Sequence, residues 1–332
     1  MNKCIYIIPI ILFAFGCKKE RLNEGGQVQI PDFNYPETIV FEDSLSEYNV
    51  FQGTPESLTP SSEYEFLELS SPLFSDYAHK QRLVKIPTGT QMSNNSDGTV
   101  NFPDGTILTK TFYYYNDERD TSLGKDIIET RLLIKQSNIW NAATYIWNTT
   151  QTEAFLEKNG SSKSVSWIDI DGISHSTAFK IPSQNECIAC HQSSSKLIPI
   201  GPTLLNLNRM VDRHGINQNQ LTYLQAEGLM NTFDVTTAPH MVNYNDQSES
   251  LEDRGRSYLH INCAHCHNPN GWNIPAQRDF DFRYGTSLTN SGIPYGKDKI
   301  TDAVSNGEMP FIGTTVLDQD GIDLINDYIE SL

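Results

Sequence analysis

The sequence has little positive charge. It contains 24 lysine and arginine residues against 41 aspartate and glutamate residues, so its formal net charge is −17. Such a surface disfavours contact with nucleic acid and with anionic lipid headgroups, because like charges repel. It suits instead a protein partner that carries a basic docking patch.

Cysteine is also scarce, with six residues in the chain. Cys4 and Cys17 fall in the amino-terminal segment, and the other four belong to two copies of one short motif. None is left over for a structural disulfide, so we expect a fold that is not held together by crosslinks.

A long apolar run is missing at the amino terminus, where the stretch 5–15 is too short to span a bilayer comfortably. Residues 1–17 therefore predict an export signal. Its last four residues resemble a bacterial lipobox, which makes Cys17 the expected lipidation site and membrane anchor. An ordinary cleaved signal with a free cysteine is the alternative. The polar residues 18–36 predict a flexible tether.

The remaining cysteines form two C-x-x-C-H motifs. One comprises Cys187, Cys190 and His191, and the second comprises Cys263, Cys266 and His267. The two thiols of such a motif can form thioether bonds with haem vinyl groups, while the following imidazole ligates the iron. Cysteines about one helical turn apart can both reach the porphyrin edge. The motifs predict two covalently bound haem c groups, with His191 and His267 as axial ligands.

Each iron has one methionine as the candidate ligand on the side opposite its histidine. Met309 lies in a Met-Pro loop 42 residues after His267, a separation that lets its thioether reach the far face of haem 2. Met230 follows His191 by 39 residues and is the candidate distal ligand of haem 1. Met210, His240 and Met241 also follow His191 at workable distances, and for haem 1 the histidine or no protein ligand is open as well. For Met309, a buried core methionine is the alternative.

Residues 37–180 predict a β-rich domain. β-branched and aromatic residues concentrate at 105–115, 131–134 and 145–147, which is typical of strands. Gly172 predicts a hairpin turn after an alternating segment. This part of the chain lacks a long helical periodicity.

The rest of the chain predicts two mainly α-helical, cytochrome c-like haem modules. Residues 181–245 would form the first, with one helix from Pro202 to near Gly215 that carries Met210 on its apolar side. A second helix is expected over 220–227.

Residues 246–332 match the class I cytochrome c arrangement more closely. A helix that contains Gly255 and Tyr258 leads directly into Cys263. The glycine would permit another helix to approach closely, and the carboxyl-terminal segment supplies the expected partner. Its apolar residues recur at helical spacing: Ile322, Ile325, Tyr328, Ile329 and Leu332.

Two other uses of the cysteines compete with haem attachment. A zinc site built from all four motif cysteines is geometrically conceivable, but it leaves the histidine after each pair unexplained. A thioredoxin-type redox pair lacks the βαβ setting that such motifs require.

These residues resemble a group of exported bacterial dihaem c-type cytochromes. Besides the two motifs, the matching pieces include residues 73–77, 102–106, 129–133 and 258–269. The second half is also similar to cytochrome modules attached to some quinoprotein sugar dehydrogenases. The resemblance implies an electron-carrying role beside a periplasmic oxidoreductase.

The sequence thus predicts a lipid-anchored dihaem c-type cytochrome that transfers single electrons in the bacterial cell envelope. It would face the periplasm or lie on the outer-membrane surface. Six-coordinate His/Met iron has no vacant position for a substrate, so a carrier is expected rather than a catalyst. A dihaem peroxidase with an open site at haem 1 is the enzymatic alternative, and a binding role for the β-rich domain is the third hypothesis.

Overall fold

The computed structural model describes residues 38–193, 196–271, 279–310 and 312–332. The predicted signal peptide, the lipidation site Cys17 and the tether at 18–36 lie outside these residues. Within the described ranges, no helix has the length and apolar character needed to cross a membrane.

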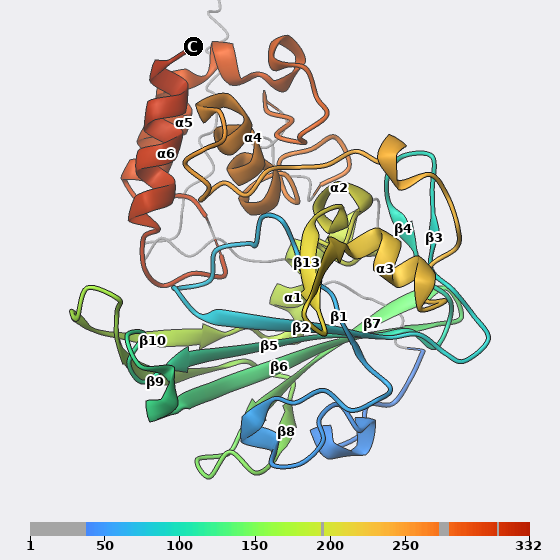
Figure 1. The fold of residues 1–332 in the computed structure, drawn as a ribbon. Helices are drawn as coiled ribbons and strands as arrows, with labels where there is room; N and C mark the ends of the chain where they lie inside the picture. Colours follow the sequence, from blue (N-terminus) through green and yellow to red (C-terminus); the bar gives the residue numbers. More distant parts are fainter. Residues whose placement is uncertain (1–37, 194–195, 272–278, 311) are drawn as a thin grey trace, which may run out of the picture. The chain divides into compact units, whose positions relative to one another are not determined.

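A six-stranded sheet dominates the structure (Figure 1). Its strand order is β1-β2-β5-β6-β7-β8, and every neighbouring pair is antiparallel. The strands are β1 (Glu65–Phe66), β2 (His79–Lys85), β5 (Ile107–Tyr115), β6 (Lys125–Gln136), β7 (Ile139–Trp147) and β8 (Ala154–Glu157). The three strands predicted from β-branched and aromatic residues are confirmed as β5, β6 and β7.

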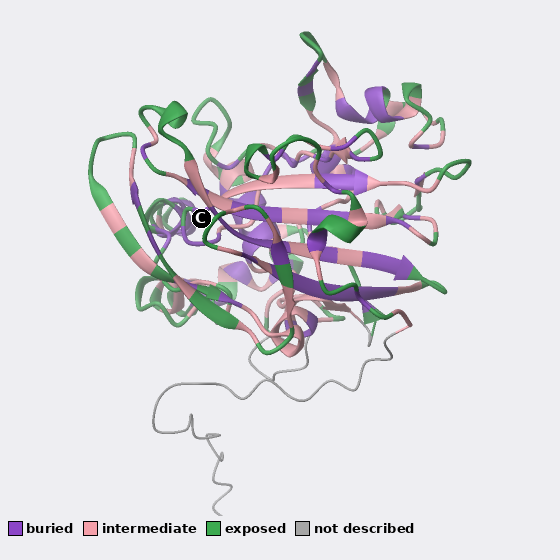
Figure 2. Ribbon diagram, turned by 90° about the horizontal axis from the view of Figure 1, so that it is seen from below, coloured by how far each residue is buried: buried purple, intermediate pink, exposed green. Residues whose placement is uncertain are grey.

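Both faces of this sheet are covered, so its side chains alternate between two cores. One face packs Leu83, Leu132 and Tyr145 against residues 41–58 of the amino-terminal segment. The other face packs its apolar side chains against the helices and hairpins that follow the sheet. Figure 2 shows the buried residues along the strands and the exposed residues mainly in the connecting loops.

Two hairpins and several short 3-10 helices accompany the sheet. β9 (Ser161–Ile168) pairs with β10 (Ser174–Ile181), and β3 (Ser93–Asn94) pairs with β4 (Val100–Asn101). Gly172 has a φ of +83° in the β9–β10 turn, which confirms the predicted hairpin. The 3-10 helices are η1 (Leu45–Tyr48), η2 (Pro55–Ser57), η3 (Thr121–Leu123), η4 (Val235–Thr237), η6 (Leu288–Ser291) and η7 (Ile293–Tyr295).

The central region mixes short helices with short hairpins. Its elements are α1 (Gln184–His191), β11 (Gln192–Ser193), β12 (Lys196–Leu197), α2 (Leu204–Leu207), β13 (Met210–Arg213), β14 (Ile216–Asn219) and α3 (Gln220–Ala226). The helix expected over 220–227 is confirmed by α3. The helix expected from Pro202 to Gly215 is wrong, because α2 ends at Leu207 and the chain continues into the β13–β14 hairpin. His214 and Gly215 both have positive φ, as a two-residue hairpin turn requires.

The carboxyl-terminal region contains α4 (Leu251–Asn262), α5 (Lys297–Ser305) and α6 (Gln319–Glu330). The predicted packing of α4 on the terminal helix is confirmed. A Cβ atom on Gly255 would lie 2.5 Å from Cγ of Tyr328, and one on Gly321 would lie 2.2 Å from the hydroxyl oxygen of Tyr258. Each helix therefore offers a glycine to an aromatic ring of the other.

The predicted fold class, a β-rich domain followed by two mainly α cytochrome modules, is wrong. The structure is mainly β through its amino-terminal and central regions, and the described residues contain six α-helices, two of them shorter than eight residues and clearly separated by strands. The described residues all belong to one compact unit. The physical reason is that α1, α2 and α3 share one apolar core with the large sheet, so they do not form a separate helical module.

Gly255→Ala is expected to lower the free energy of unfolding. Alanine gains about 1 kcal/mol in helix propensity, but the added methyl group overlaps the buried ring of Tyr328, and overpacking costs about 1–3 kcal/mol. Gly285→Ala is the control, because a Cβ there meets no atom within 4 Å. Urea denaturation measures the free energy of unfolding of both variants. Equal midpoints for the two would contradict the close helix contact.

Candidate functional site

The first C-x-x-C-H motif lies on α1, and a capping box sets where this helix begins. The backbone N–H of Ser183 donates to Oε2 of Glu186 at 2.8 Å, and Oγ of Ser183 accepts from the Glu186 N–H at 3.4 Å. Two of the orphan donors at the helix start are thereby satisfied. The helix then places Cys187, Cys190 and His191 on the wall of a cavity.

The second motif begins where α4 ends. The N–H groups of Cys266 and His267 both donate to the carbonyl of Cys263, at 3.1 and 2.9 Å, which closes a tight turn. This turn directs His265 toward the cavity. His267 instead packs against Phe282, with ring centroids 5.2 Å apart.

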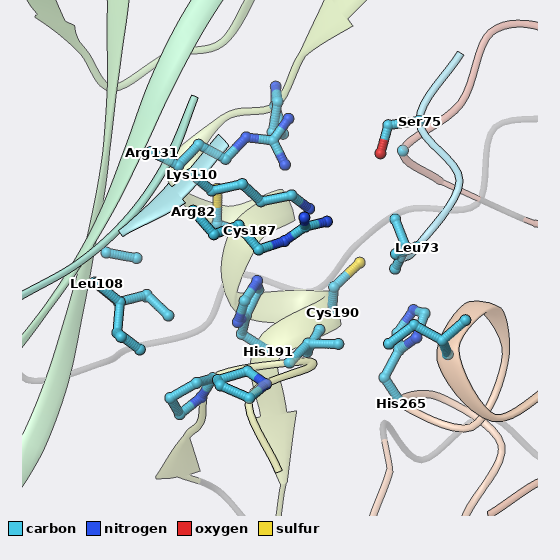
Figure 3. Close-up of a pocket in the computed structure, with 18 of the residues that line it drawn as sticks. Leu73, Ser75, Arg82, Leu108, Lys110, Arg131, Cys187, Cys190, His191 and His265 are labelled. Atoms are coloured by element: carbon cyan, nitrogen blue, oxygen red, sulfur yellow. The ribbon is translucent and has the colours of Figure 1, made fainter. Parts of the chain in front are cut away.

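The cavity has a volume of about 170 Å³ and lies between the large sheet, α1 and the end of α4. Much of the cavity wall is apolar, and its apolar residues include Leu67, Leu69, Leu108, Leu133, Pro199 and Ile200. Figure 3 shows Cys190 on α1 pointing toward the side of this space where His265 lies, with His191 next to it on the same helix. The structure therefore brings the first motif and His265 of the second, predicted to serve separate modules, to one site.

Burial keeps the motif thiols protonated. It raises the pKa of Cys263 to about 12 and that of Cys266 to about 11. The pKa of Cys190 is raised mainly by burial and further by the nearby Cys266 thiol. A protonated thiol is a poor nucleophile, so this arrangement disfavours thiol–disulfide exchange at neutral pH.

The two cavity histidines are neutral. Burial lowers the pKa of His191 to about 3 and that of His265 to about 4. Nδ1 of His191 lies 2.8 Å from the carbonyl oxygen of Ile198. A carbonyl oxygen only accepts, so Nδ1 carries the proton and Nε2 keeps its lone pair. Nε2 of His191 is thus an atom that could accept a hydrogen bond or bind a metal.

The candidate distal ligands differ in how far they are buried. Met230 is 1% exposed in the core between the sheet and α3. Met309 is half-buried after α5, and its neighbour Pro310 lines the cavity. His240 is exposed. Met210, expected on an apolar helix face, is 53% exposed on β13, so that expectation is wrong.

Three cations in the cavity wall received no role from the sequence. Arg82, Lys110 and Arg131 come from β2, β5 and β6, and all three line the cavity. Their signal in the sequence is faint: only Lys110 lies between two apolar neighbours of the same face, Leu108 and Phe112. Single strands do not reveal that the three lie together.

The prediction of two covalently bound haem c groups is contradicted. In the part of the chain that the structure describes, no group of three or more His, Cys, Asp and Glu side chains gathers to hold a metal ion. The mainly β fold also does not resemble a dihaem cytochrome. The first motif and His265 of the second line one cavity, whereas two haem modules would each need their own. The same absence of a metal-holding group among the described residues also contradicts the zinc alternative.

Comparisons with models of known families, with curated proteins and with solved structures found no match. The resemblance to exported cytochromes therefore stays a prediction from the sequence. The function has to be argued from the geometry of the cavity.

Alkylation of the motif thiols by iodoacetamide should be slow in the folded chain. At pH 8 a thiol with a pKa of about 11, as for Cys266, is about 0.1% thiolate, against roughly a quarter at the ordinary pKa of about 8.5. We expect Cys266 to react at least ~100-fold more slowly in the native than in the urea-unfolded chain. The native rate should rise about tenfold per pH unit toward pH 11. Peptide mapping by mass spectrometry measures each site, and equal native and unfolded rates would refute the buried, protonated state.

Proposed function

We propose that this protein transfers single electrons in the bacterial cell envelope, by means of a redox-active molecule held in the cavity. The observation that carries the proposal is the meeting of both C-x-x-C-H segments at one cavity, which His191 and His265 both line. Segments so far apart in sequence converge on a space that is largely apolar. The proposal makes no use of the two haem groups that the fold contradicts.

The electrostatics of the cavity favour a carrier over a catalyst. Its thiols are protonated and its histidines neutral, so these groups offer little nucleophilic or general acid chemistry near neutral pH. The carboxylate of Glu186, on the same wall, is engaged by Lys180. An apolar, enclosed setting is what tunes the potential of a bound redox group while keeping water away from it.

The charge of the chain bears on its partner. With a net charge of −17, the surface would attract a redox protein through a basic docking patch. Nucleic acid is disfavoured on the same ground. Attachment to the membrane through Cys17 belongs to the proposal as well. The dihaem peroxidase hypothesis stays a prediction that no observation in the structure favours.

The test is a spectroelectrochemical titration of the full chain, purified from a bacterial host that exports it. We expect absorbance above 300 nm that changes reversibly with a one-electron Nernst slope. His191→Ala should shift the midpoint potential or abolish the signal, because this imidazole faces the cavity.

His175→Ala is the matched control, since His175 pairs with Asp169 in the β9–β10 turn and does not line the cavity. Its titration should coincide with that of the unchanged protein. A chain whose mass equals that of the polypeptide alone and which shows no reversible absorbance would refute electron transfer.

A further inference from the structure

The three cavity cations form a single row across the sheet. The register pairs Arg82 on β2 with Lys110 on β5, and Lys110 with Arg131 on β6. Residues directly opposite each other on antiparallel strands project from the same face, with Cβ atoms about 5 Å apart. Figure 3 shows the three side chains side by side, extending into the space in front of α1.

This row carries more positive charge than the protein around it neutralises. Glu129, fully buried, binds Arg131, with Nε to Oε2 at 3.0 Å. Within the described residues, no salt bridge reaches Arg82 or Lys110. Nη2 of Arg82 is buried without a hydrogen-bond partner. Three cations therefore face one carboxylate.

Such an arrangement is costly in the protein alone. Like charges directly opposite each other on neighbouring strands are destabilising, and a buried charge without a partner costs more still. Burial, with the neighbouring Arg82 and Arg131, lowers the pKa of Lys110 well below its ordinary value. The chain is otherwise strongly acidic, so a row of this kind does not reflect its general composition.

The surroundings of the row indicate what would offset this cost. On the same face, Leu108 and Leu133 flank it on one side and Phe112 on the other. Nζ of Lys110 lies 4.7 Å from the centre of the Phe112 ring. The occupant must therefore combine an apolar body with anionic groups at one edge. Planar guanidinium groups match the geometry of carboxylates in particular.

We propose that the Arg82–Lys110–Arg131 row binds the carboxylate groups of an apolar molecule that occupies the cavity. This inference concerns binding and goes beyond electron transfer, because it does not require the molecule to be redox-active. A carboxylate between Arg82 and Lys110 would give Nη2 of Arg82 its missing acceptor and would separate two like charges.

The test compares two probes of the same shape, 2-naphthoic acid and the uncharged 2-naphthamide. Their binding to the full chain is measured by isothermal titration calorimetry at pH 7.5. We expect the acid to bind at least tenfold more tightly than the amide. Lys110→Met and Arg82→Gln should each lower the affinity for the acid by at least tenfold. Each should change the affinity for the amide by less than twofold. Equal affinity for the two probes, or no saturable binding of the acid, would overturn the proposal.

Lys85→Met is the matched control. Lys85 lies on the same strand as Arg82 but is bound by Glu63 at 2.9 Å and does not line the cavity. It should leave the affinity for the acid unchanged; a loss equal to that of Lys110→Met would mean that overall charge, not the row, governs binding.

A second measurement separates binding from a structural role. If the row exists for a ligand, Lys110→Met should raise the thermal midpoint of the ligand-free chain, because it removes an unpaired cation from between two others. A lowered midpoint, or a variant that fails to fold, would show that Lys110 supports the fold and would overturn the proposal.

Discussion

Antiparallel pairing of β2, β5 and β6 is the constraint on which the cavity depends. Because side chains alternate along each strand, this register puts Arg82, Lys110 and Arg131 in one row on one face. A shift of one residue in either pairing would move a cation into the opposite core, where apolar side chains and hydrogen-bonded threonines leave a charge no partner. The buried pair Arg131–Glu129 holds one end of the row in place.

The other walls of the cavity bring groups that burial has made neutral. α1 packs on β7 and presents thiols with raised pKa values and the His191 imidazole with a lowered one. The turn after α4 adds His265. Apart from the paired Lys180 and Glu186, the row of cations is the charged part of this wall, which is why it dominates what the cavity can attract. The two C-x-x-C-H segments contribute its shape and its donor atoms.

Local sequence patterns predicted the elements whose causes are local. The strands β5, β6 and β7 follow from their β-branched and aromatic residues, and the contact between α4 and α6 follows from Gly255 and an aromatic partner. The β13–β14 hairpin was missed because a glycine with positive φ ends a helix as readily as it turns a hairpin. Gly215 is compatible with both structures, and the chain turns there into the β13–β14 hairpin.

The site was harder to predict, because it depends on which distant segments meet. The motif spacing identified Cys187, Cys190 and His191, but it did not show that the second motif would turn His265 rather than His267 to the same cavity. The motif spacing also led to the prediction of two haem groups and two helical modules, which the structure contradicts. The cation row was beyond sequence analysis altogether, since it exists only through the register of three strands.

The most direct measurement is a crystal structure of the full chain purified from an exporting bacterial host. The account predicts electron density for a bound molecule in the cavity, with an acidic group within hydrogen-bond distance of both Arg82 and Lys110. A cavity closed by its own side chains, with Arg82 or Lys110 paired to a carboxylate of the protein, would contradict it.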